Sequence, residues 1–383
     1  MFDCLIVGCG FAGSVIARFL AEQCGKKVLI LERRDHIAGN MYDFTDENGI
    51  RVQKYGPHTF HTNQKELYDY IRKYSEWEDY KLICMSQMDG KFTPSPFNFQ
   101  TIDDFYSPEQ ASELKKHIKE YYKDASQVTI VEMLKCPDPV IQKYAHFLYD
   151  GDFSLYTAKQ WGISPFEIDP SIFKRVPVLF SYKIGYFDDT YQVMPTNGFT
   201  EFFQNILNHP NIEIRLNTDA KPFLNFQNNE ILVDGKPVPV VYTGALDELV
   251  DFRFGPLPYR SLRFDYQTKQ TASFQPAPVI AYPQAQGYTR ITEYTKLPVQ
   301  DAGGVTTIAV EYSLPYKPGV QSEPYYPILT AENIGRYQQY LREAKKIHNL
   351  FLCGRLADYQ YYNMDQVLDR SLKMCQTLEN FLK

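Results

Sequence analysis

The first thirty residues carry an apolar pattern that glycines interrupt. Residues 4–7 are apolar, a glycine-rich segment covers residues 8–13 (GCGFAG), and an apolar helical pattern covers residues 11–23. A second apolar run, residues 27–32, ends in an acidic residue. A buried strand, a glycine turn, a helix and a second strand in this order predict a parallel βαβ unit, and therefore an α/β fold.

The next part of the chain alternates between helical and hairpin patterns. Helical periodicity covers residues 64–74 and 129–149, and residues 107–123 form a charged amphipathic helix that begins with a Ser-Pro capping signal. Between them, residues 81–99 predict a hairpin that turns at Asp89-Gly90.

The second half of the chain is richer in strand patterns. Residues 175–195 are β-rich, a short helix is expected over residues 199–207, and strand-like pieces lie around Ile212 and Ile231. From 259 to 327, β-type residues alternate with prolines and predict antiparallel strands with long loops.

The chain ends in another strand, glycine and helix. Residues 349–355 (NLFLCGR) predict a buried strand, and a helix from Asp365 presents an apolar face that includes Leu368, Leu372 and Cys375. In many FAD proteins a strand, a glycine and a helix from the far end of the chain complete the cofactor site, whereas NAD-binding domains seldom need such a segment. This ending favours FAD.

The glycine-rich segment carries the candidate chemistry of the first unit. Gly8 permits a tight turn, Gly10 lets the backbone approach a pyrophosphate, and Gly13 lets the helix pack closely against the strand. The helix N-terminus offers free N–H groups to phosphates, and Glu32 stands where a carboxylate accepts hydrogen bonds from an adenosine ribose. Together they predict that a dinucleotide binds here.

Composition narrows the class of protein. The chain has 383 residues, enough for two or three domains. Its net charge of −6 does not indicate a protein that binds nucleic acid. No apolar run is long enough to span a membrane, and the motif starts too early to leave room for a signal peptide, so we expect a cytoplasmic protein. Seven cysteines without a CxxC pair fit unpaired thiols. The chain has 30 Tyr and 26 Phe, and tyrosine, with an apolar face and a hydroxyl, suits sugar and uracil surfaces, although we expect most of these aromatic residues in the core.

Short segments spread along nearly the whole chain resemble the bacterial-type UDP-galactopyranose mutase family. They are residues 7–13, 55–63 (YGPHTFHTN), 96–98 (PFN), 156–162 (YTAKQWG), 174–178 (KRVPV), 259–264 (YRSLRF), 288–290 (YTR), 323–327 (EPYYP), 354–356 (GRL) and 361–365 (YYNMD). The resemblance implies an FAD-binding Rossmann-like domain, an inserted helical domain and a six-stranded antiparallel sheet domain.

The resemblance also implies how the chain divides. We expect the FAD-binding domain to be discontinuous, the helical domain to carry a mobile loop, and the chain to pass through the sheet domain more than once. The expected ranges are 1–75, about 196–245 and 335–383 for the FAD-binding domain, about 100–172 for the helical domain, and about 76–99, 173–195 and 246–334 for the sheet domain.

The implied activity is an isomerase reaction without net redox change. In this family reduced FAD attacks the anomeric carbon of UDP-galactopyranose through N5, the ring opens, and it recloses as a furanose. The resemblance further implies a nucleotide-sugar substrate, a cellular reductant such as NAD(P)H, a homodimer, and a supply of UDP-galactofuranose to cell-surface polysaccharide.

Two arginines are the expected catalytic clamp on the diphosphate. Arg175 and Arg290 match the family's arginines on either side of the cleft, and guanidinium binds oxyanions in a bidentate manner. Arg260 is a weaker candidate, for which an ion pair is almost as good an explanation. The HxxH spacing of His58 and His61 suggests a metal, but no third ligand stands at a sensible distance, so we expect no metal site.

The remaining site residues follow from the resemblance, position by position. The expected substrate-binding residues are Tyr156, Thr157, Trp161, Tyr186, Phe187, Tyr325, Tyr326, Tyr361, Asn363 and Arg260. The expected cofactor-binding residues are Gly8, Gly10, Phe11, Ala12, Gly13, Glu32, Arg33, Asn40, His58, His61, Arg355, Met364 and Asp365.

Several positions depart from the family pattern and leave the substrate open. Leu155 stands where the family has Gly, Asn363 where it has Asp, Tyr294 where it has His, Ala38 where it has Gly, and Leu179 where an Arg is common. The same ring contraction on UDP-N-acetylgalactosamine or dTDP-fucose is therefore an alternative. A third hypothesis is an FAD-dependent oxidase of the amine-oxidase type, which shares the glycine motif, and a fourth is a flavin-binding protein without catalysis.

Overall fold

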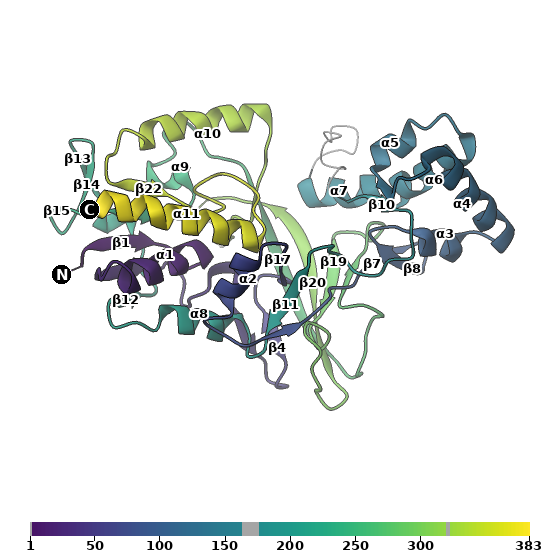
Figure 1. Ribbon diagram of the computed structural model, residues 1–383, viewed down its shortest axis with the longest axis horizontal. Coiled ribbons are helices and arrows are strands. Elements are labelled where there is room, and N and C mark those ends of the chain that lie inside the picture. The colour runs from purple at the N-terminus through teal and green to yellow at the C-terminus, as the bar shows by residue number, and fades with distance from the viewer. Residues whose placement is uncertain (1, 163–175, 319–321) are drawn as a thin grey trace.

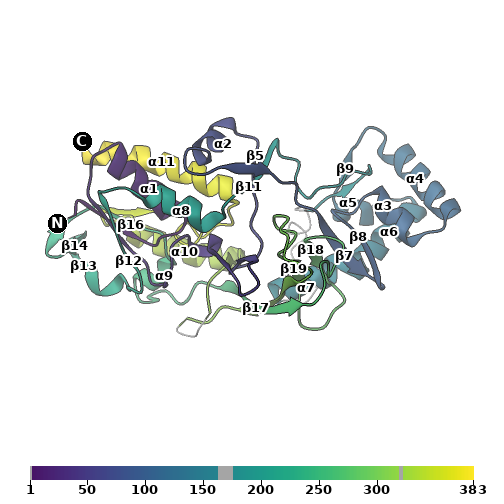
Figure 2. The same ribbon diagram turned by 90° about the horizontal axis from the view of Figure 1, so that it is seen from below.

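A parallel sheet, a larger mixed sheet and a group of helices follow one another along the long axis of the molecule (Figure 1). The computed structural model describes residues 2–162, 176–318 and 322–383. Both chain termini lie at the end of the molecule formed by the parallel sheet, as Figure 2 also shows.

The parallel sheet is doubly wound, as the opening pattern predicts. Its strand order is β12-β2-β1-β16-β22, and every neighbouring pair is parallel. The strands are β1 (Cys4–Val7), β2 (Val28–Leu31), β12 (Ile212–Arg215), β16 (Val240–Tyr242) and β22 (Leu350–Leu352). The helices around them are α1 (Phe11–Glu22), α8 (Phe199–Leu207), α9 (Leu246–Leu249), α10 (Ala331–Ala344) and α11 (Met364–Leu382).

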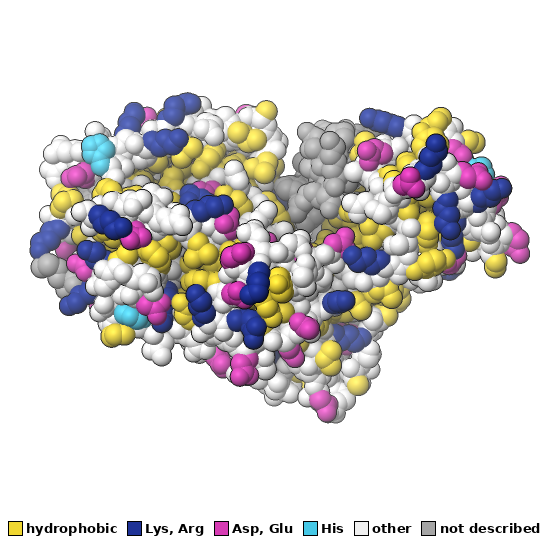
Figure 3. Space-filling model, in the orientation of Figure 1, with side chains coloured by type: hydrophobic (Ala, Val, Ile, Leu, Met, Phe, Trp, Pro, Cys, Tyr) yellow, Lys and Arg dark blue, Asp and Glu magenta, His cyan; other side chains and the backbone are white. Residues whose placement is uncertain are grey.

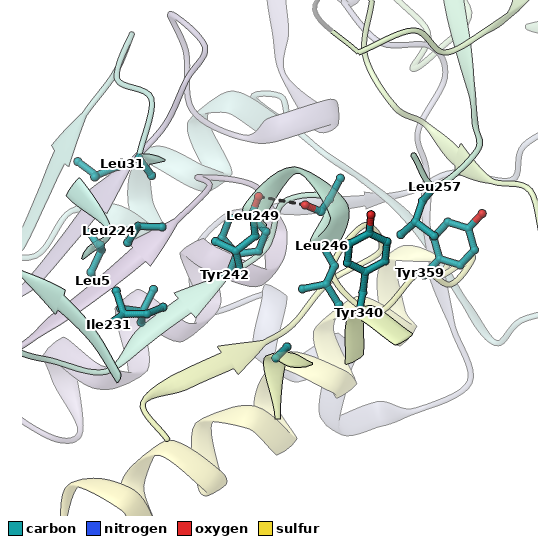
Figure 4. Close-up of a cluster of buried hydrophobic side chains, with 14 of the residues drawn as sticks. Leu5, Leu31, Leu224, Ile231, Tyr242, Leu246, Leu249, Leu257, Tyr340 and Tyr359 are labelled. Atoms are coloured by element: carbon teal, nitrogen blue, oxygen red, sulfur yellow. Dashed lines mark hydrogen bonds between the residues drawn. The ribbon is translucent and has the colours of Figure 1, made fainter. Parts of the chain in front are cut away.

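Alternation along β1 builds a core on each face of this sheet. Cys4 and Ile6 pack in the cluster that includes residues of α1 and α11, whereas Leu5 packs in the cluster that includes Tyr340 of α10. Figure 4 shows this second core, in which the Tyr242 hydroxyl donates to the Ala245 carbonyl at 3.1 Å. The expectation of a buried last strand is wrong, because β22 lies at the sheet edge and its three residues are only half-buried.

The mixed sheet has seven strands in the order β21-β17-β20-β19-β18-β7-β8. The resemblance implied six antiparallel strands, but here β18 and β7 pair in parallel while the other pairs are antiparallel. The expected hairpin supplies β7 and β8, with Asp89 and Gly90 at positive φ in its turn. The strands are β7 (Cys84–Met88), β8 (Lys91–Ser95), β17 (Tyr259–Lys269), β18 (Val279–Ala281), β19 (Arg290–Glu293), β20 (Thr306–Pro315) and β21 (Tyr326–Pro327).

The helical group lies beyond the mixed sheet at the other end of the molecule (Figure 1). The helix expected over residues 129–149 is two helices, because Asp138 caps a new helix at which Pro139 takes the first position. The group contains α3 (Phe99–Phe105), α4 (Pro108–Tyr122), α5 (Ile130–Leu134), α6 (Pro139–Leu148), the π-helical turn η2 (Tyr149–Phe153) and α7 (Ser154–Trp161).

Short elements complete the described chain. The β-rich segment expected up to residue 195 contains only two strands, β10 and β11, because residues 180–190 are irregular. The other elements are α2 (Lys65–Ile71), η1 (Gly39–Met41), η5 (Lys221–Phe223), β3 (Asp43–Thr45), β4 (Arg51–Gln53), β5 (Phe60–Thr62), β6 (Trp77–Asp79), β9 (Gln127–Val128), β10 (Val178–Leu179), β11 (Tyr191–Pro195), β13 (Asn225–Gln227), β14 (Glu230–Val233) and β15 (Lys236–Pro237).

Charges of both signs are interspersed on the face shown in Figure 3. Within the described ranges, no helix combines the length and the apolar character that a bilayer crossing needs.

Candidate active site

The glycine motif forms a narrow backbone cradle between β1 and α1. Gly8 has a φ of +102°, and a Cβ at Gly13 would lie 2.0 Å from the Gly8 carbonyl oxygen, so neither position accepts a side chain. The first helical hydrogen bond of α1 runs from the Ser14 N–H to the Gly10 carbonyl at 3.0 Å. The N–H groups of Phe11, Ala12 and Gly13 therefore have no partner within the helix and are available to phosphate oxygens.

Glu32 is fixed in place at the end of β2. Its two carboxylate oxygens accept hydrogen bonds from the backbone N–H groups of Cys9, at 2.7 Å, and Arg34, at 2.9 Å. Glu32 is buried, yet it lines the cleft beside the glycine cradle. The carboxylate keeps further lone pairs, which is what hydrogen bonding to ribose hydroxyls requires.

A cleft of about 1390 Å³ runs from this cradle toward the mixed sheet. It starts at the carboxyl ends of β1, β2 and β16, where ligands of open α/β sheets bind. It is larger than a typical pocket for a drug-sized molecule, which suits an extended dinucleotide. Ten of the expected cofactor residues line it, namely Gly8, Gly10, Phe11, Ala12, Glu32, Arg33, Asn40, His58, Arg355 and Met364.

Three expected cofactor residues do not line this cleft. Gly13 packs against Gly8 and acts through the shape of the cradle. His61 stacks on Phe187 with ring centroids 3.6 Å apart, and its Nδ1 lies 2.8 Å from Asp189 Oδ2. Asp365, in the first turn of α11, accepts a hydrogen bond from the Gln366 N–H. Cofactor roles for these three residues, as for the ten that line the cleft, stay predictions.

Arg34 is a cleft residue that the sequence did not indicate. Its guanidinium donates to Glu323 at 2.8 Å and to Asn40 at 2.9 Å, and it lies over the Tyr55 ring. Arg33 also contacts Glu323, at 3.1 Å. Glu323 lies between β20 and β21 in the sequence, so only the folded chain brings these charges together. The one sequence signal was the adjacent Arg-Arg pair directly after Glu32.

His58 is a neutral side chain in the cleft. Burial, helped by the charges of Arg355 and Arg290, lowers the pKa of His58 to about 4 against the opposing effect of the Gly56 carbonyl. That carbonyl lies 2.8 Å from His58 Nδ1. At neutral pH the imidazole can therefore both donate and accept a hydrogen bond, but it adds no positive charge.

Arg290 is held in position by Glu311 from the neighbouring strand. Its Nε donates to Glu311 Oε2 at 2.6 Å, and the Thr289 hydroxyl donates to the other carboxylate oxygen at 3.0 Å. Burial opposes the charge of Arg290, but Glu311, Tyr156 and Tyr326 raise its pKa well above the ordinary value. Arg290 is therefore a fixed cation whose other guanidinium nitrogens are not used by Glu311.

Aromatic rings and a second arginine surround this cation. The Tyr326 and Tyr361 rings stack with centroids 5.6 Å apart, and the Arg355 guanidinium lies within 6 Å of both. Tyr325 contacts Tyr326 and lines the cleft. The structure thus brings together four residues that the sequence assigned to substrate and cofactor, from segments far apart in the chain.

The expected base-binding residues come from α7 and from the segment between β10 and β11. Electrostatic contact with Arg290 and with Tyr186 places the Tyr156 hydroxyl beside both, and burial raises the pKa of Tyr156. Phe187 packs edge-to-face on Tyr186, with centroids 4.9 Å apart. Thr157, next along α7, is buried. Arg175 and the Trp161 side chain lie outside the described residues, so their roles stay predictions.

Arg260 and Asn363 serve local structure. Arg260 is buried and donates to the Gln160 carbonyl at 2.9 Å and to the Ser313 hydroxyl at 2.9 Å. It contacts the C-terminus of α7, and none of its contacts in the described chain is the ion pair that we considered. Asn363 is the N-cap residue of α11, a position that accepts Asn and Asp equally well.

Two departures from the family pattern also have structural explanations. Tyr294 is fully buried, and its hydroxyl donates to the Gln53 carbonyl at 2.8 Å. Ala38 adopts a φ of +72° before η1, a conformation that suits glycine better. Within the described residues, no three side chains of the metal-ligating types come together, and His58 and His61 have separate partners.

Comparisons with known proteins agree with this geometry. A family model described as UDP-galactopyranose mutase matches residues 153–361, more than half of the chain. A second model, described as an NAD(P)-binding Rossmann-like domain, matches residues 6–74, which contain the glycine cradle.

Relatives and a solved structure extend the match to the full length. The chain is 33% identical to UDP-galactopyranose mutase of Mycoplasma pneumoniae, over 98% of this chain and 96% of that one. It is also 33% identical to dTDP-fucopyranose mutase of Escherichia coli, over 97% of each. A crystal structure of reduced UDP-galactopyranose mutase superimposes with a TM-score of 0.71 at 15% identity, covering 100% of this chain and 94% of that one, and shows the shared fold.

Proposed function

This chain belongs to the UDP-galactopyranose mutase family, and from that premise we propose that it interconverts the pyranose and furanose forms of a nucleoside-diphosphate sugar. The observation that carries the proposal is the fixed cation Arg290 within an aromatic cluster that also contacts Arg355 of the dinucleotide cleft. An oxidase of the amine-oxidase type would have no use for such a cation. The family match also argues against a flavin protein without catalysis.

The described residues fit FAD as the cofactor. The cradle has no room for a Cβ at Gly8 or Gly13 and leaves the N-terminus of α1 open to a pyrophosphate. Glu32 is positioned for a ribose, and the chain returns through β22 and α11 to bring Arg355 and Met364 to the cleft. Reduced flavin supplies the nucleophile for the anomeric carbon, and the reaction has no net redox change. Oxidised enzyme should bind substrate and turn over negligibly.

The chain's own residues hold the leaving diphosphate and exclude water. Arg290, with Arg175 as its proposed partner, offers charge-assisted hydrogen bonds that favour release of the nucleoside diphosphate and keep it in place for its return. Tyr325, Tyr326 and Tyr361 form an apolar wall with hydroxyl donors along the diphosphate and sugar. Tyr156, Tyr186 and Phe187 receive the base.

UDP-galactopyranose is the substrate that we propose, because most family motifs are present. The dTDP-fucopyranose mutase relative, at the same identity as the Mycoplasma enzyme, supports dTDP-fucopyranose as the second candidate. UDP-N-acetylgalactosamine remains an alternative from the sequence. We further propose a cytoplasmic homodimer, reduced by NAD(P)H, that supplies furanose for cell-surface polysaccharide.

Chromatography of the reduced holoenzyme with each nucleotide sugar tests this assignment. We expect furanose product from both UDP-galactopyranose and dTDP-fucopyranose, with the higher kcat/KM for UDP-galactopyranose. Asn363→Asp restores the family residue without loss of a helix cap, so a shift of about tenfold in the ratio of the two kcat/KM values would identify residue 363 as a specificity residue. A higher kcat/KM for dTDP-fucopyranose in the wild type would overturn the substrate, and no furanose from any sugar would overturn the activity.

A further inference from the structure

Helix α7 is joined to the mixed sheet by polar contacts at both of its ends. Before the helix, the Ser86 hydroxyl of β7 donates to the buried carboxylate of Asp152 at 2.5 Å. At its C-terminus, Arg260 of β17 and Ser313 of β20 both donate to the Gln160 carbonyl. Figure 2 shows α7 beside the strands of this sheet, and α7 also contacts β20.

Lys159 makes a further contact from the last turn of α7. Its ammonium group donates to three backbone carbonyls, those of Tyr282 at 2.5 Å, Ala285 at 2.9 Å and Tyr288 at 2.9 Å. An ammonium has three donors, so this one is fully used. All three carbonyls belong to the loop that joins β18 to β19, and none is a carboxylate, although Asp152 acts on Lys159 electrostatically.

The loop that Lys159 fills leads directly into Arg290. Tyr288 precedes Thr289, whose hydroxyl contacts Glu311, and Arg290 begins β19. The Tyr282 N–H donates to the Thr289 carbonyl at 2.9 Å and closes the loop across the ammonium. A displaced loop would therefore displace the first residue of β19.

Lys159 also shares a helix face with a base-binding residue. Tyr156 stands three positions earlier on α7, and residues three apart are neighbours on a helix surface. Electrostatic contact between Tyr156 and Arg290 shows that this face is turned toward β19. One side chain thus bridges the helix that receives the base and the strand that receives the diphosphate.

We propose that Lys159 is a positioning residue that fixes the distance between the base-binding helix and Arg290, and so determines affinity for the nucleoside diphosphate. This inference rests on the proposed function, because it assigns both sides of the bridge to one nucleotide. It requires no contact between Lys159 and the substrate. Burial lowers the pKa of Lys159 to about 8, as expected for an amine that carbonyls rather than carboxylates surround.

Binding of UDP to the FAD-loaded enzyme, measured by calorimetry, tests the proposal without turnover. We expect Lys159→Met, which keeps the chain length and loses all three donors, to raise the Kd of UDP and the KM of the nucleotide sugar in parallel by about tenfold. Lys159→Arg should recover part of the affinity, because guanidinium can still donate to several carbonyls. The flavin absorption spectrum should be unchanged in both.

Lys296→Met is the matched control. Lys296 also donates to a backbone carbonyl, that of Gln275, and to the Ser273 hydroxyl, both in the loop between β17 and β18. It forms an ion pair with Glu293 at 3.0 Å, and it does not line the cleft. We expect this variant to lose thermal stability and to bind UDP like the wild type. If Lys159→Met does not accumulate as holoenzyme, Lys159→Gln replaces it with the same expectation.

The outcomes distinguish a failure of the positioning role of Lys159 from a failure of the proposed function. Wild-type UDP affinity in Lys159→Met, or an equal loss in Lys296→Met, would overturn the positioning role while leaving the proposed function intact. Failure of the wild-type holoenzyme to bind either UDP or dTDP would instead contradict the proposed function itself.

Discussion

Some charged side chains of this molecule are held in position by protein groups before any ligand binds. Arg290 is the clearest case, because Glu311 orients one edge of its guanidinium at 2.6 Å and leaves the other nitrogens for an oxyanion. The Glu311 side chain is buried, with 6% exposed, whereas 22% of the Arg290 side chain is exposed, so the carboxylate holds the guanidinium from the protein side. Such preorganisation is how a fixed cation contributes to a reaction that develops negative charge on a leaving group.

Replacing Arg290 should therefore lower the rate of turnover more than it destabilises the cofactor site. We expect Arg290→Ala to lower kcat/KM by about 10- to 100-fold, since a charge-assisted hydrogen bond contributes about 1.5–3 kcal/mol. Arg290→Lys should recover little, because lysine lacks the planar fork. Arg336→Ala, on the surface of α10, is the matched control, and steady-state kinetics of the reduced enzyme is the measurement. Undiminished kcat/KM in Arg290→Ala would remove it from the site.

The protonation of His58 should make the free energy of unfolding depend on pH in the acidic range. Its folded pKa of about 4 lies below its unfolded value of 6.5, so the unfolded chain binds the proton first as the pH falls. The stability that this neutral side chain provides is present above about pH 6.5 and is lost as the pH falls toward 4, by up to about 3 kcal/mol. Asp152 and Asp247, whose pKa values burial raises to about 6, act with the opposite sign.

Comparison of wild type with His58→Gln isolates this contribution. Denaturant unfolding between pH 7 and pH 4.5 should show a steeper loss of unfolding free energy in the wild type than in the variant. Parallel pH profiles would mean that His58 is already charged, or exposed, in the folded protein.

At the scale of elements, local sequence signals predicted some helices and strands well, whereas the state of other strands depends on pairing between distant parts of the chain. The first strand, its glycine turn, helix α1 and β2 follow from one continuous motif, and α4 follows from its Ser107 cap and Pro108. The interior strand β16 was not predicted, because Pro237 and Pro239 interrupt the apolar pattern just before it. The half-buried state of β22 depends on its place at the sheet edge, which no local pattern contains.

The same division holds for the site. The cradle and Glu32 were predictable because their chemistry is contained within thirty residues. The partners that fix the cleft were not, because Arg34 and Glu323 are separated by 289 positions and Arg290 meets Glu311 only through strand pairing. The roles of Lys159 and Arg260 likewise appear only when α7 is seen against the mixed sheet.

The βαβ element should govern retention of the cofactor and nothing else. We expect Glu32→Ala to raise the Kd of FAD about tenfold or more, since it removes a ribose acceptor and leaves the Cys9 N–H without its partner. Titration of apoprotein with FAD measures this, with Glu22→Ala at the exposed end of α1 as the control. Unchanged FAD affinity would contradict the role of Glu32 in binding the cofactor. A higher Kd for UDP in the FAD-saturated variant would contradict the expectation that this element acts on the cofactor alone.

At the scale of the whole molecule, two sheets divide the work. The parallel sheet presents the cradle and Glu32 at its carboxyl edge, and the mixed sheet presents Arg290 and Tyr326 and contacts α7, the helix that we propose receives the base. Arg355 connects them, because it lines the cleft and lies over the Tyr326 and Tyr361 rings. A cofactor from one side therefore meets a nucleotide sugar from the other, in a fold that the family shares.

The central claim is ring contraction without net redox change, and one anaerobic measurement tests it most directly. Dithionite-reduced holoenzyme is mixed with UDP-galactopyranose, the sugar products are separated by chromatography, and the flavin absorbance is recorded at the same time. We predict that UDP-galactofuranose accumulates to equilibrium while the flavin stays reduced, and that the oxidised enzyme yields negligible product. Equal product from oxidised and reduced enzyme, or an oxidised sugar formed in step with a change of flavin redox state, would contradict the claim.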